Sequence, residues 1–128
     1  MIKKLGHIGI CVSDAEKADK FFTDILNARQ SSVLEFPEMG QRSAYYRLAD
    51  GTCFEVMTPT REGGVVDQFL KKHGEGFHHI SVITDDIKET VIDLEDQGCR
   101  ILPGGEKFAF LHPSSGLHIL YELVEGKD

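Results

Sequence analysis

Apolar positions recur with a helical period in two segments of the chain. Over residues 15–26 and again over residues 87–94 they fall at three- and four-residue spacings, which predicts two amphipathic helices. Ser13, followed three residues later by Glu16, is typical of a capping box at the start of the first helix. Gly98 is typical of the end of the second.

Shorter runs rich in apolar residues, bounded by turn residues, predict strands. One such run precedes each helix; the first begins at His7 and the second at His79. Asp50-Gly51 is typical of a hairpin turn. The other expected strands lie near 30–36, 41–48, 52–58, 99–102, 106–111 and 117–124. Each half of the chain therefore reads β-α-β-β-β.

This repeat sets the domain organisation. We expect a first module over 1–58, a packed linker helix within 59–76 and a second module over 77–128. A single β-α-β-β-β unit leaves one sheet face uncovered, so the two modules are expected to form one domain over 1–128. The predicted fold class is α+β, with both modules contributing to an eight-stranded mixed sheet.

Composition narrows the function. The 128 residues carry a net charge of −7 and are 41% hydrophobic and 27% charged, which suits one folded domain. Scattered basic residues in an acidic chain argue against nucleic-acid binding. No apolar run approaches the roughly 20 residues of a membrane span, and the first residues lack the apolar core of a signal peptide. We therefore expect a cytoplasmic protein. The acidic balance does not exclude an acidic small-molecule ligand.

The candidate chemistry follows from alternation along the strands. His7 and His79 begin corresponding strands, and each half carries a strand Glu between apolar neighbours, Glu55 in the first and Glu122 in the second. Two imidazoles and two carboxylates suit a divalent first-row metal, and they would converge if the halves pair about a pseudo-twofold axis. Two alternatives stay open: hydrogen-bonded core histidines and solvent-facing glutamates.

Several motifs carry a resemblance that covers nearly the whole chain. They are H-I-G-I-C-V-S-D (7–14), F-E-V-M-T-P (54–59), F-L-K-K-H-G-E-G-F-H-H-I-S-V (69–82), F-L-H-P (110–113) and L-Y-E-L-V-E (120–125). The chain resembles the vicinal oxygen chelate superfamily, and within it the methylmalonyl-CoA epimerases most of all, with glyoxalase I more distant.

The resemblance implies paired modules curled into a cleft around one divalent metal ion per chain. Carried over by position, the ligands are His7, Glu55, His79 and Glu122. Of the adjacent histidines, His78 points to the opposite strand face and is not a ligand. The sequence does not distinguish Co, Mn, Ni, Zn or Mg, and a homodimer is expected by resemblance alone.

The expected activity is that of an epimerase that removes a proton next to the carbonyl of an acyl-CoA or other thioester. Glu122 and Glu55 are the candidate catalytic residues, with Glu122 as the base. Two alternatives are a glyoxalase I-like lactoylglutathione lyase acting on a hemithioacetal and a non-catalytic small-molecule-binding protein of the same fold.

Two departures from the epimerase pattern put the substrate in doubt. Ser43 stands where some epimerases carry a further catalytic Glu, and the loop before F-L-H-P is short. The substrate and the stereochemical outcome are therefore not fixed by the sequence. Weaker candidates for substrate binding are Arg42, Ser43, Arg47, Lys107 and His112.

Overall fold

The computed structural model describes residues 1–126, so the last two residues of the predicted second module lie outside it. The helices and strands occur in the predicted order. Their bounds are β1 Ile2–Cys11, α1 Ala15–Lys20, η1 Phe21–Ile25, β2 Arg29–Phe36, η2 Pro37–Met39, β3 Gln41–Arg47, β4 Cys53–Pro59, α2 Val65–His73, β5 Gly76–Thr84, α3 Ile87–Asp96, β6 Ile101–Pro103, β7 Phe108–Leu111 and β8 Tyr121–Glu125.

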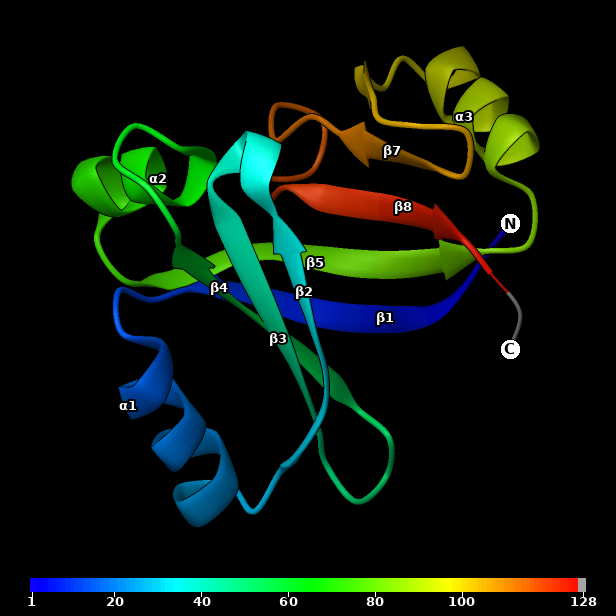
Figure 1. Cartoon of the computed structure of the whole chain (residues 1–128). Helices are drawn as coiled ribbons and strands as arrows, with labels where there is room; N and C mark the ends of the chain where they lie inside the picture. The colour runs from blue at the N-terminus through cyan, green and yellow to red at the C-terminus, as the bar shows by residue number, and fades with distance from the viewer. Residues whose placement is uncertain (127–128) are drawn as a thin grey trace. The chain divides into compact units, whose positions relative to one another are not determined.

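The strands form one eight-stranded sheet in the order β2-β3-β4-β1-β5-β8-β7-β6 (Figure 1). Read outward from the central pair, both halves have the same order, as the sequence repeat predicts. Strand β5 runs parallel to β8, whereas β2–β3, β3–β4, β6–β7 and β7–β8 are antiparallel. The predicted α+β class with a mixed sheet is confirmed. None of the helices among residues 1–126 is long and apolar enough to span a bilayer.

The chain divides into two compact units whose boundaries cut β1 and β5. The central unit is Ile8–His78, and the terminal unit is Met1–His7 together with the chain from His79 onward. In the central unit one apolar cluster packs around Phe22 and Tyr46, whose rings stack with centroids 4.9 Å apart, and another places Val66 of α2 against Cys11. These clusters anchor α1 and α2.

In the terminal unit, α3 lies over β6, β7 and β8 (Figure 1). Its buried Ile87 packs with Ala109 and Leu123, so this face of the sheet is the apolar one. The Asp86 side chain accepts a hydrogen bond from the backbone N–H of Glu89, as an N-cap does.

The turn residues behave as the sequence predicts. Gly98 follows α3 with a positive φ of 88°, and Gly51 has a φ of 89° in the hairpin between β3 and β4. Both backbone conformations favour glycine, so glycine suits the turn after α3 and the hairpin turn between β3 and β4.

The predicted capping box at the first helix is wrong. Asp14 is the N-cap, and its carboxylate accepts from the backbone N–H of Lys17 at 3.1 Å. Ser13 instead donates to Glu75 Oε2 through its backbone N–H and its hydroxyl, at 2.9 and 3.0 Å. The helix then continues as a π-helical turn, Phe21–Ile25.

The last strand is shorter than the predicted 117–124, because β8 begins only at Tyr121. Leu117 and His118 have φ values of 60° and 71°, which a strand does not allow. The His118 backbone N–H bonds to the carbonyl of Pro113, so this segment is a turn.

Candidate metal centre

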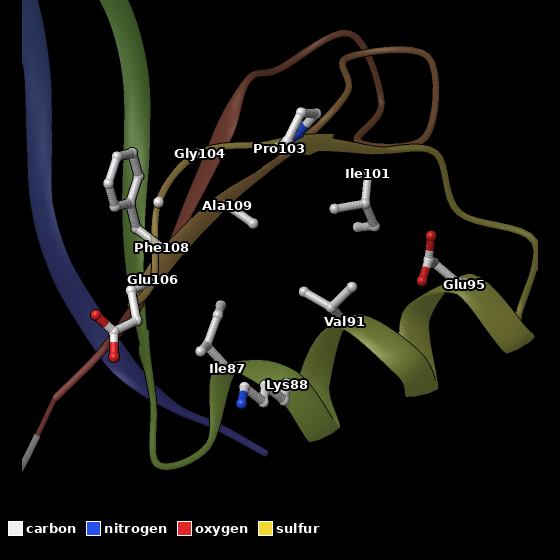
Figure 2. A pocket seen from close by; sticks show the side chains of 11 residues that line it. Ile87, Lys88, Val91, Glu95, Ile101, Pro103, Gly104, Glu106, Phe108 and Ala109 are labelled. Carbon is white, nitrogen blue, oxygen red and sulfur yellow. The ribbon is translucent and has the colours of Figure 1, made fainter.

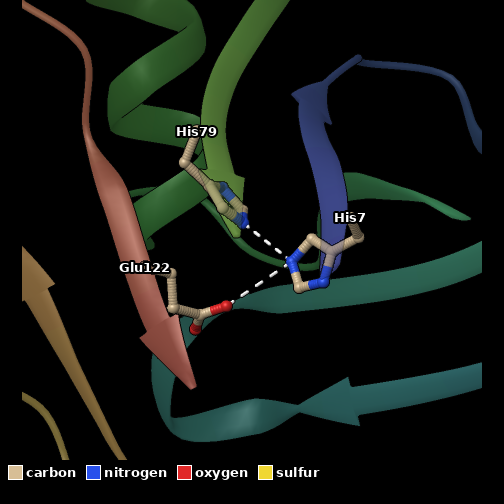
Figure 3. Close-up of side chains that lie close together, drawn as sticks. All are labelled: His7, His79 and Glu122. Atoms are coloured by element: carbon tan, nitrogen blue, oxygen red, sulfur yellow. Dashed lines mark hydrogen bonds and ion pairs between the residues drawn. The ribbon is translucent and has the colours of Figure 1, made fainter. Parts of the chain in front are cut away.

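Three of the four predicted ligands meet in the terminal unit (Figure 3). His7 Nε2 lies 3.0 Å from His79 Nε2 and 3.5 Å from Glu122 Oε1. Nitrogen and oxygen atoms of all three side chains lie within 4.8 Å of one another. We call His7, His79 and Glu122 the His–His–Glu cluster.

Each member comes from a different strand. His7 lies on β1, His79 on β5 and Glu122 on β8, and the parallel register of β5 and β8 pairs Glu122 with Ser81, two residues after His79. Side chains at i and i+2 share a strand face, so this register brings Glu122 to the face of His79. Neighbouring strands, not local sequence, therefore assemble the cluster.

The cluster fits a small divalent ion. Two ligand atoms bonded to one ion at about 2.1 Å lie about 3.0 Å apart at a right angle and about 3.4 Å apart at the tetrahedral angle. The observed separations from His7 Nε2, 3.0 and 3.5 Å, match these values. Two imidazole nitrogens and one carboxylate oxygen also suit Zn²⁺ and other first-row ions chemically.

Burial supports the same interpretation. His79 is 5% exposed, and the side chains of His7 and Glu122 are 17% and 21% exposed. The two imidazole rings meet edge to face, with their centroids 5.1 Å apart. The partial exposure of the Glu122 side chain suits a site that admits substrate, because catalytic ions keep a coordination position for substrate.

Glu55, the fourth predicted ligand, belongs to the central unit, where it is 6% exposed. Its Oε2 accepts from the hydroxyls of Ser43 at 2.8 Å and Tyr45 at 3.1 Å. Gln41 Nε2 donates to Ser43 Oγ at 2.9 Å, so Ser43 has its single proton available for Glu55. Two hydroxyls and an amide thus orient a buried carboxylate.

The buried thiols of the central unit are poor ligands by comparison. Burial, and secondarily the Glu55 carboxylate, raises the pKa of Cys11 to about 12. Burial likewise raises the pKa of Cys53. A metal-binding or nucleophilic cysteine acts as the thiolate, which neither residue forms near neutral pH.

The five weaker substrate-binding candidates have the following contacts. The Ser43 hydroxyl is engaged with Glu55 and Gln41. Arg47 donates from Nη1 to the carbonyl of Gly51 at 3.0 Å. His112 Nδ1 accepts from the backbone N–H of Ser114 at 3.0 Å. Arg42 is half-buried in β3, and Lys107 is exposed before β7.

A separate hollow of about 660 Å³ lies between α3 and the β6–β7 segment (Figure 2). Ile87, Val91 and Ala109 are among the apolar side chains that line it. Phe110 pairs with Glu122 across β7 and β8, so Ala109 next to it faces the other side of the sheet. This hollow is therefore on the opposite sheet face from Glu122 and is not part of the cluster.

The sequence analysis did not identify Gln41 and Tyr45, which both contribute to the hydrogen-bond network around Glu55. The signal was present: Gln41, Ser43 and Tyr45 alternate along one strand, which places three polar side chains on one face. The antiparallel register that pairs Tyr45 with Glu55 then brings that face to the carboxylate.

Comparison with known proteins identifies the family. The model of the Glyoxalase/Bleomycin resistance protein/Dioxygenase superfamily matches residues 6–113. The chain belongs to this superfamily. The predicted resemblance is thereby confirmed.

Several relatives are epimerases. A mitochondrial methylmalonyl-CoA epimerase of Mus musculus is 32% identical over 95% of this chain and 72% of its own length. An ethylmalonyl-CoA/methylmalonyl-CoA epimerase of Cereibacter sphaeroides is 31% identical over 98% of this chain and 99% of its own.

A solved structure gives the same result. It is a Streptomyces coelicolor methylmalonyl-CoA epimerase variant in complex with 2-nitronate-propionyl-CoA, 29% identical, with a TM-score of 0.85 over 98% of this chain and 96% of that one. The protein is thus a superfamily member related to epimerases, with a candidate His/Glu metal site.

Proposed function

We propose that the protein is a metal-dependent epimerase that acts on a 2-substituted acyl-CoA thioester such as methylmalonyl-CoA. The observation that carries the proposal is the His–His–Glu cluster, two imidazole nitrogens and a carboxylate within reach of one ion. The relatives named as methylmalonyl-CoA epimerases, and the solved one in complex with 2-nitronate-propionyl-CoA, support the substrate class.

In this proposal His7, His79 and Glu122 hold a divalent ion. Glu55 is the predicted fourth ligand on the sequence argument alone, because it belongs to the other unit. When bound, the ion supplies a Lewis acid that draws charge from a carbonyl oxygen and lowers the barrier to loss of the neighbouring proton.

Glu122 is the proposed base. With both imidazoles engaged as ligands, its carboxylate is the member of the cluster that has an oxygen to accept the substrate proton. Its side chain is also the most exposed of the three. A carboxylate within hydrogen-bond reach of the proton is the geometric requirement for general base catalysis. Glu55, oriented by Ser43 and Tyr45, is the second proposed catalytic carboxylate.

Solvent exchange tests the proposal. The metal-loaded protein in D₂O should place deuterium at the α-carbon of methylmalonyl-CoA faster than a protein-free blank. Glu122→Gln should abolish this exchange while it weakens ion retention less. Glu125→Gln is the matched control: Glu125 Oε1 accepts from the backbone N–H of Ile87, a bond that glutamine can also accept, and exchange should persist.

The result also separates the alternatives. If the protein catalyses no exchange with methylmalonyl-CoA but turns over the methylglyoxal–glutathione hemithioacetal, it is a lyase and not an epimerase. A Haemophilus influenzae lactoylglutathione lyase is 28% identical over 94% of this chain. Binding without turnover of either compound would indicate a binding protein. A cytoplasmic location and a homodimer stay predictions.

A further inference from the structure

Ser81 is an unusual residue of the terminal unit. It is completely buried, and its Oγ is the one buried side-chain oxygen or nitrogen in residues 1–126 for which the chain supplies no hydrogen-bond partner. Buried hydroxyls in folded proteins almost always have a partner. The missing partner of Ser81 Oγ is therefore expected to be a group that comes within hydrogen-bond distance only when another part of the site moves.

The location of Ser81 indicates which group this is. Ser81 follows His79 by two residues, so both side chains share one face of β5. Its register partner on the parallel neighbour β8 is Glu122. Adjacent strands lie about 4.8 Å apart, so the Ser81 hydroxyl stands beside the Glu122 side chain.

The neighbouring backbone leaves room for this hydroxyl. A Cβ placed on Gly6, the residue before His7, would lie 2.9 Å from Ser81 Oγ and 3.0 Å from Ile83 Cδ1. Any side chain at position 6 would therefore displace the hydroxyl. Glycine at this position therefore leaves space for the Ser81 hydroxyl beside β1, the strand that carries His7.

We propose that Ser81 is a positioning residue for Glu122, an inference that rests on the proposed function. In the structure Glu122 Oε1 leans toward His7, at 3.5 Å from Nε2. When the carboxylate turns to bind the ion or to take the substrate proton, the Ser81 hydroxyl donates to it. One carboxylate oxygen is then held, and the other is aimed at its target.

The test uses two substitutions at this site, Ser81→Ala and Ser81→Cys. Both remove a good donor, and cysteine nearly preserves the side-chain volume, although its S–H donates weakly. We expect Co²⁺ affinity, measured by equilibrium dialysis, to fall by about 10–100-fold in each, the usual effect of losing a partner that orients a metal ligand. We expect kcat of epimerisation to fall similarly, with KM for methylmalonyl-CoA within about twofold.

Stability of the metal-free protein provides the second readout. Because the chain offers the Ser81 hydroxyl no partner, Ser81→Ala should leave the Tm of the metal-free protein unchanged or raise it. The matched control is Thr90→Val, which removes a buried hydroxyl 2.6 Å from Thr84 Oγ1. It should lower the Tm and leave Co²⁺ affinity unchanged.

Two outcomes would overturn the inference. One is a Ser81→Ala protein that binds Co²⁺ and turns over like the wild type. The other is a metal-free Ser81→Ala protein destabilised as much as Thr90→Val, which would show a structural partner. A wild-type protein that binds no ion and turns over no thioester would contradict the proposed function itself. A wild-type protein that does both, with an unaffected Ser81→Ala variant, would contradict only the role of Ser81.

Discussion

Replacing Ser43 by alanine tests how firmly the central unit holds Glu55. Ser43 is completely buried; it donates to Glu55 Oε2 at 2.8 Å and accepts from Gln41 Nε2 at 2.9 Å. Alanine removes both hydrogen bonds and leaves an amide donor and a carboxylate, 8% and 6% exposed, each with one partner fewer.

The magnitude follows from these two losses. A hydrogen bond to a charged group contributes roughly 1.5–3 kcal/mol, and a buried donor left without its partner costs roughly 1–3 kcal/mol. The two contributions are not fully additive, because both come from the Ser43 hydroxyl and because Gln41 keeps slight exposure to solvent. We therefore expect the free energy of unfolding to fall by about 3 kcal/mol in total. For a chain of this length that lowers the Tm by about 10 °C.

Urea unfolding followed by circular dichroism measures this difference. The midpoint should fall while the slope with denaturant stays constant, because the native fold is kept. Ser31→Ala is the matched control: its exposed hydroxyl donates to the carbonyl of Tyr45 at 3.3 Å, and its loss should change stability by less than about 0.5 kcal/mol. A Ser43→Ala protein as stable as Ser31→Ala would refute the role assigned to this network.

Three further predictions concern groups outside the cluster. Hydrogen bonds from Ser13 lower the pKa of Glu75 below its usual 4.5, so the Glu75 charge stabilises the fold fully above pH 4.5 and loses this effect as the pH falls through the lowered pKa. The Tm difference between wild type and Glu75→Gln should therefore shrink as the pH is lowered below 4.5. A Tm difference that stays constant would contradict this prediction. Burial raises the pKa of Cys11 and Cys53, so iodoacetamide at pH 7.5 should modify the half-buried Cys99 before either of them. Mass spectrometry of the labelled, folded protein measures the order. Equal labelling of all three cysteines would contradict the prediction. Leu117 is 87% exposed and has a φ of 60°, a conformation that glycine adopts more easily than other residues. Leu117→Gly should therefore raise the free energy of unfolding by about 0.5–1 kcal/mol, whereas Leu117→Ala should not. Equal effects of the two substitutions in thermal melts would argue against backbone strain at this position.

Elements governed by local chemistry were predictable from the sequence. Gly51 and Gly98, predicted as turn residues, both have the positive φ that favours glycine, one in the β3–β4 hairpin and one after α3. Each depends on contacts within a few residues, which the sequence displays directly. The β-α-β-β-β repeat was predictable for the same reason, because its strand and helix periods are local patterns.

The errors arise where distant residues or turn geometry decide. Ser13 and Asp14 are both good N-cap residues, and the choice between them depends on Glu75, which lies 62 residues away in sequence. The alternation of side chains over 117–124 suits a strand, yet the hydrogen bond from the His118 backbone N–H to the Pro113 carbonyl holds the start of this segment in a turn. Neither contact has a signal in the hydrophobic pattern.

The candidate site shows the same division. Alternation and the repeat singled out His7, His79 and Glu122, and the structure brings these three together. The roles of Tyr45 and Ser81 depend on which residues face each other across neighbouring strands. Register depends on which strands pair in the folded sheet, so the sequence of one strand alone does not show which residues it faces.

Equilibrium dialysis against Co²⁺ tests the central claim most directly, using the wild type, His79→Ala and, as control, His73→Ala. His73 is exposed at the end of α2, where its ring packs on Phe69 with centroids 4.8 Å apart. Wild type and His73→Ala should bind one ion per chain, and His79→Ala should bind it more than about 100-fold more weakly, since even the loss of an outer partner of a ligand costs 10–100-fold. A wild-type protein that binds no ion, or a His79→Ala protein that binds it as tightly as the wild type, would contradict the account.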